Sequence, residues 1–395
     1  MAGKRQRQKR AEPGGGDLAN GNKDQVGAGG AWWNAAQLAR GAFASRQWED
    51  GRAGRECEGM RCKRFRARAV LWVVLTAMLP MVVISWAAAV PLSDIISGIS
   101  ESSYRHFLYD VLYTHDGDNR GFGPEHDLAR AAIYNTFAGY GLTTSLHPFT
   151  YGGNTYYNVV GIRPGTETPE KWMVLGAHYD SVSNPGADDD ASGVAALLES
   201  ARVLSQYEFR SSIVFVAFDR EEQGLIGSIA FCNTYDLQAI LGMVQLDMIA
   251  YNPAGPYENL VSVYSGRRLL YPEWRHEVAV AVNNFARGLT ANEHTATGTA
   301  ASDHQSFEDH WKPAALVIED TIFRPESNPY YHTARDSVDT PGYLDLTYAT
   351  EITRAMAGLA ANTAGMVPEP ETVALVVLGL AVLLAMRWRL ALRVG

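Results

Sequence analysis

Five short segments of this chain carry His, Asp and Glu residues, and all five lie between Gly176 and Thr333. These side chains are the ones that bind zinc in proteins through nitrogen and oxygen atoms. A site with two zinc ions needs one shared carboxylate, one His and one further carboxylate for each ion, and a free carboxylate as base. The chain has a candidate for each of these positions. The segments are 178–180, 186–193, 219–222, 246–248 and 331–333.

Apolar runs around these segments alternate between strand-like and helix-like patterns. We expect strands at 156–162, 172–176, 212–218 and 242–248, and helices at 128–140, 194–204 and 225–234. This alternation predicts an α/β domain, over residues 90–366, with a largely parallel sheet covered by helices on both faces. Such sheets collect their ligands beyond the carboxyl ends of the strands. His178, Glu221, Glu222 and Asp247 each close or follow a predicted strand.

Charge excludes one class of partner. Residues 90–366 hold 34 Asp and Glu residues against 16 Lys and Arg residues, a net charge of −18. A domain this acidic is not expected to bind nucleic acid. Cys232 is the one cysteine of this domain, so we expect a buried small side chain and no internal disulfide. Residues 1–59 lack a sustained apolar period and are expected to be a disordered extension, or to precede the true start at Met60.

Residues 60–89 have the parts of an export signal in their usual order. Five basic residues between 61 and 68 precede an apolar run from Ala69 to Ser85, and Ala87-x-Ala89 then fits a signal-peptidase site. We therefore predict a signal peptide. An uncleaved N-terminal membrane segment is the alternative, because the run is long enough to span a bilayer.

Residues 367–395 resemble the PEP-CTERM sorting tail of Gram-negative bacteria. Val367 is followed by Pro-Glu-Pro, an apolar run over 372–386 and several arginines. The resemblance implies that an exosortase recognises and removes this tail. Basic residues lie outside both apolar segments, so the positive-inside rule sends the middle across the membrane. We expect an exported protein of the periplasm, cell surface or extracellular space that is anchored transiently through its terminal hydrophobic segments.

The five segments together resemble the family-twenty-eight metallopeptidases of clan MH, the bacterial leucyl aminopeptidase and aminopeptidase Y group. The pieces His-x-Asp, Gly-x-x-Asp-x-x-Ser-Gly, Glu-Glu-x-Gly-x-x-Gly-Ser, Leu-Asp-Met and one distal His occur in the order of that family, and the resemblance covers residues 104–362. It implies the zinc-dependent exopeptidase fold, a mixed, largely parallel central sheet sandwiched by helices. It also implies an aminopeptidase that hydrolyses N-terminal residues from peptide substrates by metal-activated hydroxide.

The same resemblance implies five ligands for two zinc ions (Zn2+) per chain. His178 and Asp247 would bind the first ion, Glu222 and His332 would bind the second, and Asp189 would bridge both. Two ions bring a charge of +4, the three carboxylates bring −3 and a bridging hydroxide brings −1, so the buried centre would be close to neutral.

Carboxylates beside the ligands take other roles in this interpretation. By family match Glu221 is the general base, which takes a proton from water and passes it to the leaving amine. Residues two apart share a face of an extended segment, so Asp180 is expected to accept the proton on the second ring nitrogen of His178. Asp188 and Asp190 are expected to serve the loop and the first turn of the next helix.

The loop 298–304 matches the family loop that borders the site, but with one departure. Thr299 stands where bacterial leucyl aminopeptidases have a Tyr that polarises the scissile carbonyl, so the partner of the oxyanion is open. His304 and His310 are interpreted as structural, because the ligand set is complete without them. Three tyrosines could take the missing role, although a packing role is the favoured interpretation of each: Tyr251, Tyr330 and Tyr331.

Two other functions are compatible with the fold. A single-zinc acyltransferase like the glutaminyl cyclases would bind one metal, whereas the presence of both His178 and Glu222 favours two. A receptor-like domain without catalysis would usually lack some ligands, and here each ligand position has its residue.

Overall fold

The structure is a computed structural model. The chain divides into two units, residues 1–71 and 72–395, and every described residue belongs to the second unit. The predictions for residues 1–59 and 60–89 fall outside the described residues, as does nearly all of the predicted sorting tail. Within the described ranges, none of the helices has both the length and the apolar composition needed to span a bilayer. The structure describes residues 90–113, 119–321, 324, 327–367, 379, 383, 384 and 386.

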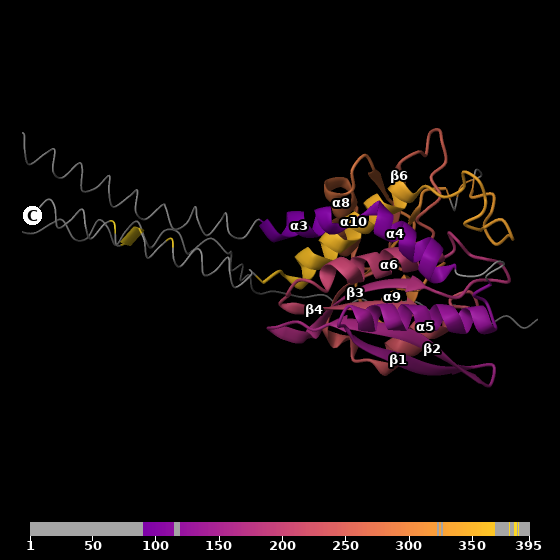
Figure 1. Ribbon diagram of the computed structural model, residues 1–395, viewed down its shortest axis with the longest axis horizontal. Coiled ribbons are helices and arrows are strands. Elements are labelled where there is room, and N and C mark those ends of the chain that lie inside the picture. The colour runs from indigo at the N-terminus through magenta and orange to yellow at the C-terminus, as the bar shows by residue number, and fades with distance from the viewer. Residues whose placement is uncertain are drawn as a thin grey trace, which may run out of the picture. The chain divides into compact units, whose positions relative to one another are not determined.

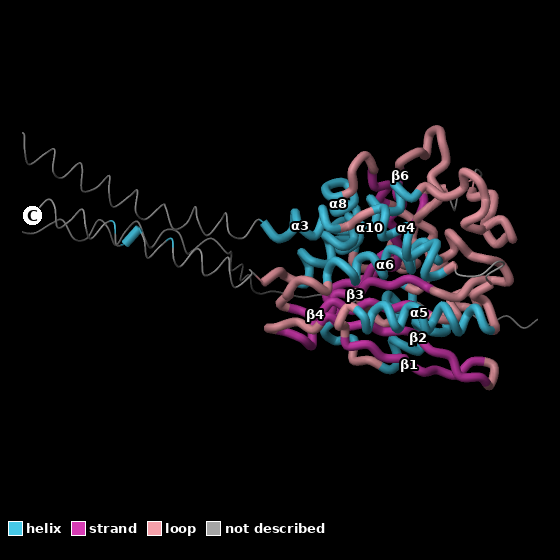
Figure 2. The backbone as a smooth tube through the Cα atoms, in the orientation of Figure 1, coloured by secondary structure: helices cyan, strands magenta, loops and turns pink. Residues whose placement is uncertain are grey.

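A mixed sheet of eight strands forms the centre of the described domain (Figures 1 and 2). Its strand order is β1-β2-β4-β3-β5-β8-β6-β7. The four central strands β4, β3, β5 and β8 are parallel, whereas β2 pairs with β4 and β6 pairs with β8 in antiparallel fashion. The strands are β1 Thr143–Tyr151, β2 Asn154–Arg163, β3 Thr168–His178, β4 Ser211–Phe218, β5 Ile240–Leu246, β6 Leu260–Tyr264, β7 Thr290–Glu293 and β8 Ala314–Glu319.

The central strands are apolar on both faces because each face meets its own layer of helices. On β4, Ile213 and Phe215 point into one hydrophobic cluster, while Val214 and Val216 point into another. Successive side chains of a strand point to opposite faces, so an unbroken apolar run is buried on both sides. For this reason the inner strands have continuous apolar sequences and not alternating ones.

Helices cover the sheet on both sides (Figure 1). The larger hydrophobic cluster contains residues of α5, α6, α8 and α10, and the smaller one contains residues of α7 and α9. The prediction of a largely parallel sheet between helical layers is therefore confirmed. The helices are α3 Val90–Gly98, α4 Glu101–His106, the π-helix η1 Phe107–Leu112, α5 Pro124–Gly139, α6 Ala191–Leu204, α7 Ile226–Thr234, the 3-10 helix η2 Leu237–Ala239, α8 Pro272–Phe285, α9 His304–Asp309 and α10 Leu346–Ala364.

The first described residues pack firmly against α6. Glu199 is buried on that helix, and its carboxylate accepts hydrogen bonds from the Ser100 backbone N–H at 2.8 Å and the Ser103 hydroxyl at 2.6 Å. Tyr104 donates to the Ser192 carbonyl at 3.0 Å. The domain core thus begins within a few residues of Val90.

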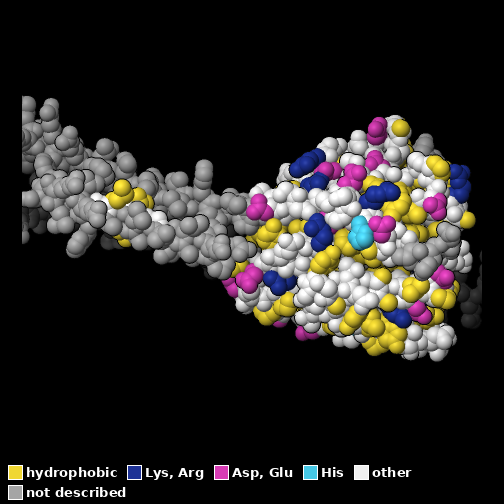
Figure 3. Space-filling view, in the orientation of Figure 1, with side chains coloured by type: hydrophobic (Ala, Val, Ile, Leu, Met, Phe, Trp, Pro, Cys, Tyr) yellow, Lys and Arg dark blue, Asp and Glu magenta, His cyan; other side chains and the backbone are white. Residues whose placement is uncertain are grey.

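The surface shows no concentration of positive charge on the face drawn in Figure 3. Acidic and basic side chains are interspersed there among apolar and uncharged ones. Inside, Cys232 is buried and unpaired, as predicted.

Candidate metal centre

The candidate ligands meet at one edge of the sheet because three of their segments follow adjacent parallel strands. His178 is the last residue of β3, Glu222 follows β4, and Asp247 follows β5 directly. Parallel neighbours end at the same edge, so these side chains converge. Asp189 lies just before α6, and His332 lies in the connection between β8 and α10.

Asp189 stands between the two histidines. Its Oδ1 lies 3.2 Å from Nε2 of His178, and its Oδ2 lies 3.1 Å from Nε2 of His332. Asp247 Oδ1 lies 3.7 Å from the same nitrogen of His178, and Glu222 Oε2 lies 3.3 Å from the same nitrogen of His332. The structure therefore brings all five predicted ligands together, with one oxygen of Asp189 facing each half.

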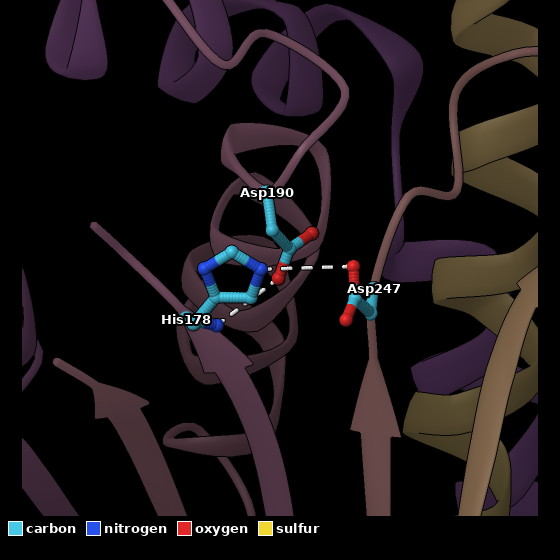
Figure 4. A group of neighbouring side chains, drawn as sticks. All are labelled: His178, Asp190 and Asp247. Atoms are coloured by element: carbon cyan, nitrogen blue, oxygen red, sulfur yellow. Dashed lines mark hydrogen bonds and ion pairs between the residues drawn. The ribbon is translucent and has the colours of Figure 1, made fainter. Parts of the chain in front are cut away.

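Asp190 also lies in this cluster, beside His178 and Asp247 (Figure 4). Both of its carboxylate oxygens are already engaged by backbone N–H groups. Oδ1 accepts from Gly193 at 2.9 Å and Met248 at 3.2 Å, and Oδ2 accepts from His178 at 3.0 Å. Asp190 is thus the N-cap of α6, as expected, and it also ties together the ends of β3 and β5.

Asp180 supports His178 in a different way from the one predicted. The ring Nδ1 of His178 lies 3.0 Å from the main-chain carbonyl of Asp180 and 3.6 Å from its carboxylate. A carbonyl can only accept, so Nδ1 carries the proton and Nε2 is left free to bind a metal. The carboxylate instead accepts from the backbone N–H groups of Glu221 at 3.1 Å and Glu222 at 3.4 Å.

The sequence profile named Peptidase family M28 matches residues 158–360, which include all five candidate ligands. The chain belongs to this family. A probable zinc metalloprotease of Pyrenophora tritici-repentis is 40% identical over 107 residues, which cover 24% of this chain and 25% of the relative. Leucine aminopeptidase 1 of Ajellomyces dermatitidis is 31% identical over 224 residues, which cover 52% of this chain and 55% of the relative. The chain thus spans only a quarter to about half of the length of these curated relatives.

Solved structures show the same M28 architecture. The LapA aminopeptidase of Legionella pneumophila superimposes with a TM-score of 0.59 at 23% identity, covering 70% of this chain and 75% of LapA. At that identity the likeness concerns the fold. Within it, this M28 chain supplies two imidazole nitrogens and three carboxylates, a donor set that suits zinc.

Three residues beside the ligands of this M28 chain have left-handed backbone conformations. Arg220, Met248 and His332 have φ values of 62°, 52° and 57°. Such conformations cost side-chain-bearing residues about 1–3 kcal/mol and persist where the surroundings fix them. Arg220 is fixed by burial between the rings of Phe122 and Tyr156, at 4.4 and 4.3 Å from their centres. Sharp turns therefore occur at His332 and next to Asp247 and Glu221.

The histidines and carboxylates of the cluster shift one another's pKa values. Burial alone would raise the pKa of Asp189, but hydrogen bonds from His178 and His332 hold it below its usual value. Hydrogen bonds to Asp189 and Glu222 raise the pKa of His332 to about 10. Burial raises the pKa of Glu221, and so does the nearby Asp303.

Sequence reasoning missed the contact of Ser302 with a ligand. Ser302 is buried and donates its hydroxyl proton to Asp247 Oδ2 at 2.6 Å, which orients that carboxylate toward His178. The sequence feature that could have indicated this contact is the position of Ser302 in the loop 298–304, which matches the family loop at the border of the site. His304 and His310 bond to the main-chain carbonyls of Thr299 and Ser306, so both are structural, as expected.

The structure separates the three candidate tyrosines. Tyr331 stacks on the ring of His332 with centroids 3.8 Å apart. Burial and the negative charges of Asp189, Asp247, Glu222 and Glu221 raise the pKa of Tyr331, which places its hydroxyl in the field of the cluster. Tyr330 and Tyr251 instead pack against the ring of Tyr343.

Proposed function

We propose that this protein is an exported zinc-dependent aminopeptidase with two zinc ions per chain, which removes N-terminal residues from peptides. The observation that carries the proposal is the position of Asp189, whose two oxygens face His178 on one side and His332 on the other. A carboxylate placed in this way suits a bridge between two cations. The leucine aminopeptidase relative supports the substrate class.

Zinc fits the donor set of the two groups. His178, Asp189 and Asp247 would hold one ion, and Asp189, Glu222 and His332 would hold the other. Bound zinc would polarise the scissile carbonyl as a Lewis acid and lower the pKa of water to near neutrality. The residues around the ions must then position the substrate and move one proton.

Glu221 is the residue that we assign to this proton transfer, because it holds the position of the general base in the family pattern. Its backbone N–H donates to the Asp180 carboxylate at 3.1 Å, and the Asp180 carbonyl accepts from His178. One residue therefore positions both the general base and a ligand. The raised pKa of Glu221 suits a group that accepts a proton and returns it to the leaving amine.

Tyr331 is the proposed partner of the substrate carbonyl. Its ring is held against His332, and Thr299 occupies the position where related enzymes carry a Tyr. A phenol hydroxyl can donate a hydrogen bond to an oxygen as it gains negative charge. Tyr331→Phe should then lower kcat more than it raises KM.

The test compares the wild-type protein with the variant Glu221→Gln. Wild type should contain about two zinc ions per chain, and Glu221→Gln should keep them while kcat falls about 10²–10⁴-fold. Glu170→Gln is the matched control, because Glu170 is exposed at the start of β3. Full activity in the folded Glu221→Gln protein would refute the assigned role.

Substrate direction is tested with paired peptides. A panel of aminoacyl substrates should be cleaved, and the same peptides with a blocked N-terminus should not. Cleavage of blocked peptides alone would refute the aminopeptidase. One zinc per chain, with ring closure of N-terminal glutamine in place of hydrolysis, would favour the glutaminyl-cyclase alternative.

Export is proposed from the two ends of the chain. Cleavage by signal peptidase after Ala89 would leave the core intact, since the first fully buried residue described is Ile95. At the other end the Val367 backbone N–H donates to the Glu208 carbonyl at 3.0 Å, directly before the Pro-Glu-Pro motif that an exosortase would recognise. N-terminal sequencing and mass measurement of the mature protein test both cleavages. A mature protein that keeps residues 60–89 would instead support the membrane anchor.

A further inference from the structure

The loop 179–190 carries the bridging position and is held from two sides. It joins His178, at the end of β3, to α6, and it includes Asp189. The buried guanidinium of Arg120 donates hydrogen bonds to carbonyl groups of the loop. The buried carboxylate of Asp336 accepts hydrogen bonds from its amide groups. Neither residue belongs to the loop itself.

Arg120 contacts three main-chain carbonyls of the loop. Its Nε donates to the Tyr179 carbonyl at 3.0 Å, its Nη1 to the Pro185 carbonyl at 2.8 Å, and its Nη2 to the Gly186 carbonyl at 2.5 Å. Nη1 also donates to the Tyr113 hydroxyl at 2.7 Å. The side chain is buried, so these bonds take the place of water. The rigid, planar guanidinium fixes the directions of its N–H groups, so a single side chain holds these three carbonyls in one arrangement.

Asp336 contacts the loop through its amides. Its Oδ1 accepts from the backbone N–H of Asp188 at 2.7 Å, and its Oδ2 accepts from that of Asp189 at 3.3 Å. The Tyr343 hydroxyl donates to the same carboxylate at 3.0 Å. Asp336 follows His332 by four residues, so it links the segment of one histidine to the loop of the bridging carboxylate.

We infer that Arg120 and Asp336 are positioning residues, which set the zinc affinity of the centre by fixing the backbone of the Asp189 loop. Neither side chain belongs to the two ligand groups found among the described residues. Arg120 lies outside residues 158–360, so the part of the chain before the family match takes part in shaping the metal centre. The inference rests on the proposed two-zinc function.

The experiment measures zinc affinity of the full chain by competition with a chromogenic chelator. Arg120→Lys, Arg120→Met and Asp336→Asn should each weaken zinc binding about 10–100-fold, the usual effect of losing a partner that orients a ligand. Tyr113→Phe removes the hydrogen bond that Arg120 donates to the Tyr113 hydroxyl and the one that this hydroxyl donates to the Pro185 carbonyl, and it should weaken binding several-fold. Arg130→Met is the control, because Arg130 pairs with exposed Asp127 on α5, and it should bind zinc like wild type.

Two further measurements distinguish a positioning role of Arg120 and Asp336 from a general contribution to stability. Saturating zinc should restore most of the kcat of Arg120→Lys, since its ligands are intact. Wild-type zinc affinity in Arg120→Lys, with only a lower melting temperature, would overturn the inference. If both Arg120 variants fail to fold, unchanged affinity in Tyr113→Phe and Asp336→Asn overturns it. A wild-type protein that binds no zinc would instead refute the proposed function itself.

Discussion

Asp189 and Asp190 are neighbours in sequence, yet the structure gives them opposite roles that one pair of substitutions can separate. The carboxylate of Asp189 faces the imidazoles of His178 and His332. The carboxylate of Asp190 accepts three backbone N–H groups. Asp189→Asn should therefore remove zinc at small cost in stability, and Asp190→Asn should destabilise the domain while zinc still binds.

The magnitude follows from the contacts of Asp190. An Asn side chain has one acceptor oxygen, which can still serve Gly193 and Met248, but its amide group then faces the N–H of His178. That buried N–H loses its acceptor and meets a second donor. Losing a hydrogen bond to a charged group costs about 1.5–3 kcal/mol, and a buried unpaired donor about 1–3 kcal/mol. Because the two terms overlap, we expect a loss of about 2–4 kcal/mol.

Urea unfolding of the metal-free variants measures the loss, and zinc analysis of the folded variants measures occupancy. Asp236→Asn is the matched control, because exposed Asp236 caps the 3-10 helix η2 through the single backbone N–H of Gln238. Asn caps a helix about as well as Asp, so this control should lose less than about 1 kcal/mol. Zinc loss in Asp190→Asn without loss of stability would make Asp190 the ligand and refute the assignment.

Three further predictions concern the core. Burial lowers the pKa of His304 to about 4, so the unfolded chain binds a proton here at a higher pH than the folded protein does. The free energy of unfolding should therefore fall as the pH drops from about 6.5 through 4. His304→Gln should remove this pH dependence in urea titrations at a series of pH values. Burial raises the pKa of the Cys232 thiol, so a thiol reagent at mildly alkaline pH should label the Cys232 peptide after unfolding but not before, as mass spectrometry would show. A Cβ at Gly242 would lie 2.3 Å from Cζ2 of Trp274, so Gly242→Ala should cost about 1–3 kcal/mol in a thermal or urea melt, and an unchanged melt would contradict the close packing.

The inner half of the fold could be predicted because its signals are local and strong. The run at 212–218 is apolar without interruption, and the structure has β4 at Ser211–Phe218. The helix expected at 194–204 is α6, Ala191–Leu204, with its cap at Asp190. Strands β1, β6, β7 and β8 were not predicted. The sequence of β8, AALVIE, carries an apolar signal that was overlooked, whereas β7 carries none. β7, Thr290–Glu293, has the sequence TANE, which carries no apolar alternation, and it exists through its pairing with β6.

The candidate ligands could be predicted because their side chains do the chemistry and recur in a recognisable order. The supports of the centre act on the main chain instead. Arg120 donates hydrogen bonds to main-chain carbonyls, and Asp336 accepts them from main-chain amides. Asp180 accepts a hydrogen bond from His178 through its own main-chain carbonyl. The direction of a peptide group is set by the folded loop and leaves no pattern of residue types. Such contacts become visible only with coordinates.

The two halves of the centre differ in their access to solvent. The side chain of His178 is 1% exposed, whereas that of His332 is 38% exposed. A cation beside His178 would be enclosed by protein, and a cation beside His332 would lie closer to solvent. If two zinc ions bind as proposed, the two positions would load unequally: under metal scarcity the outer position would empty first, and it would regain its ion without unfolding.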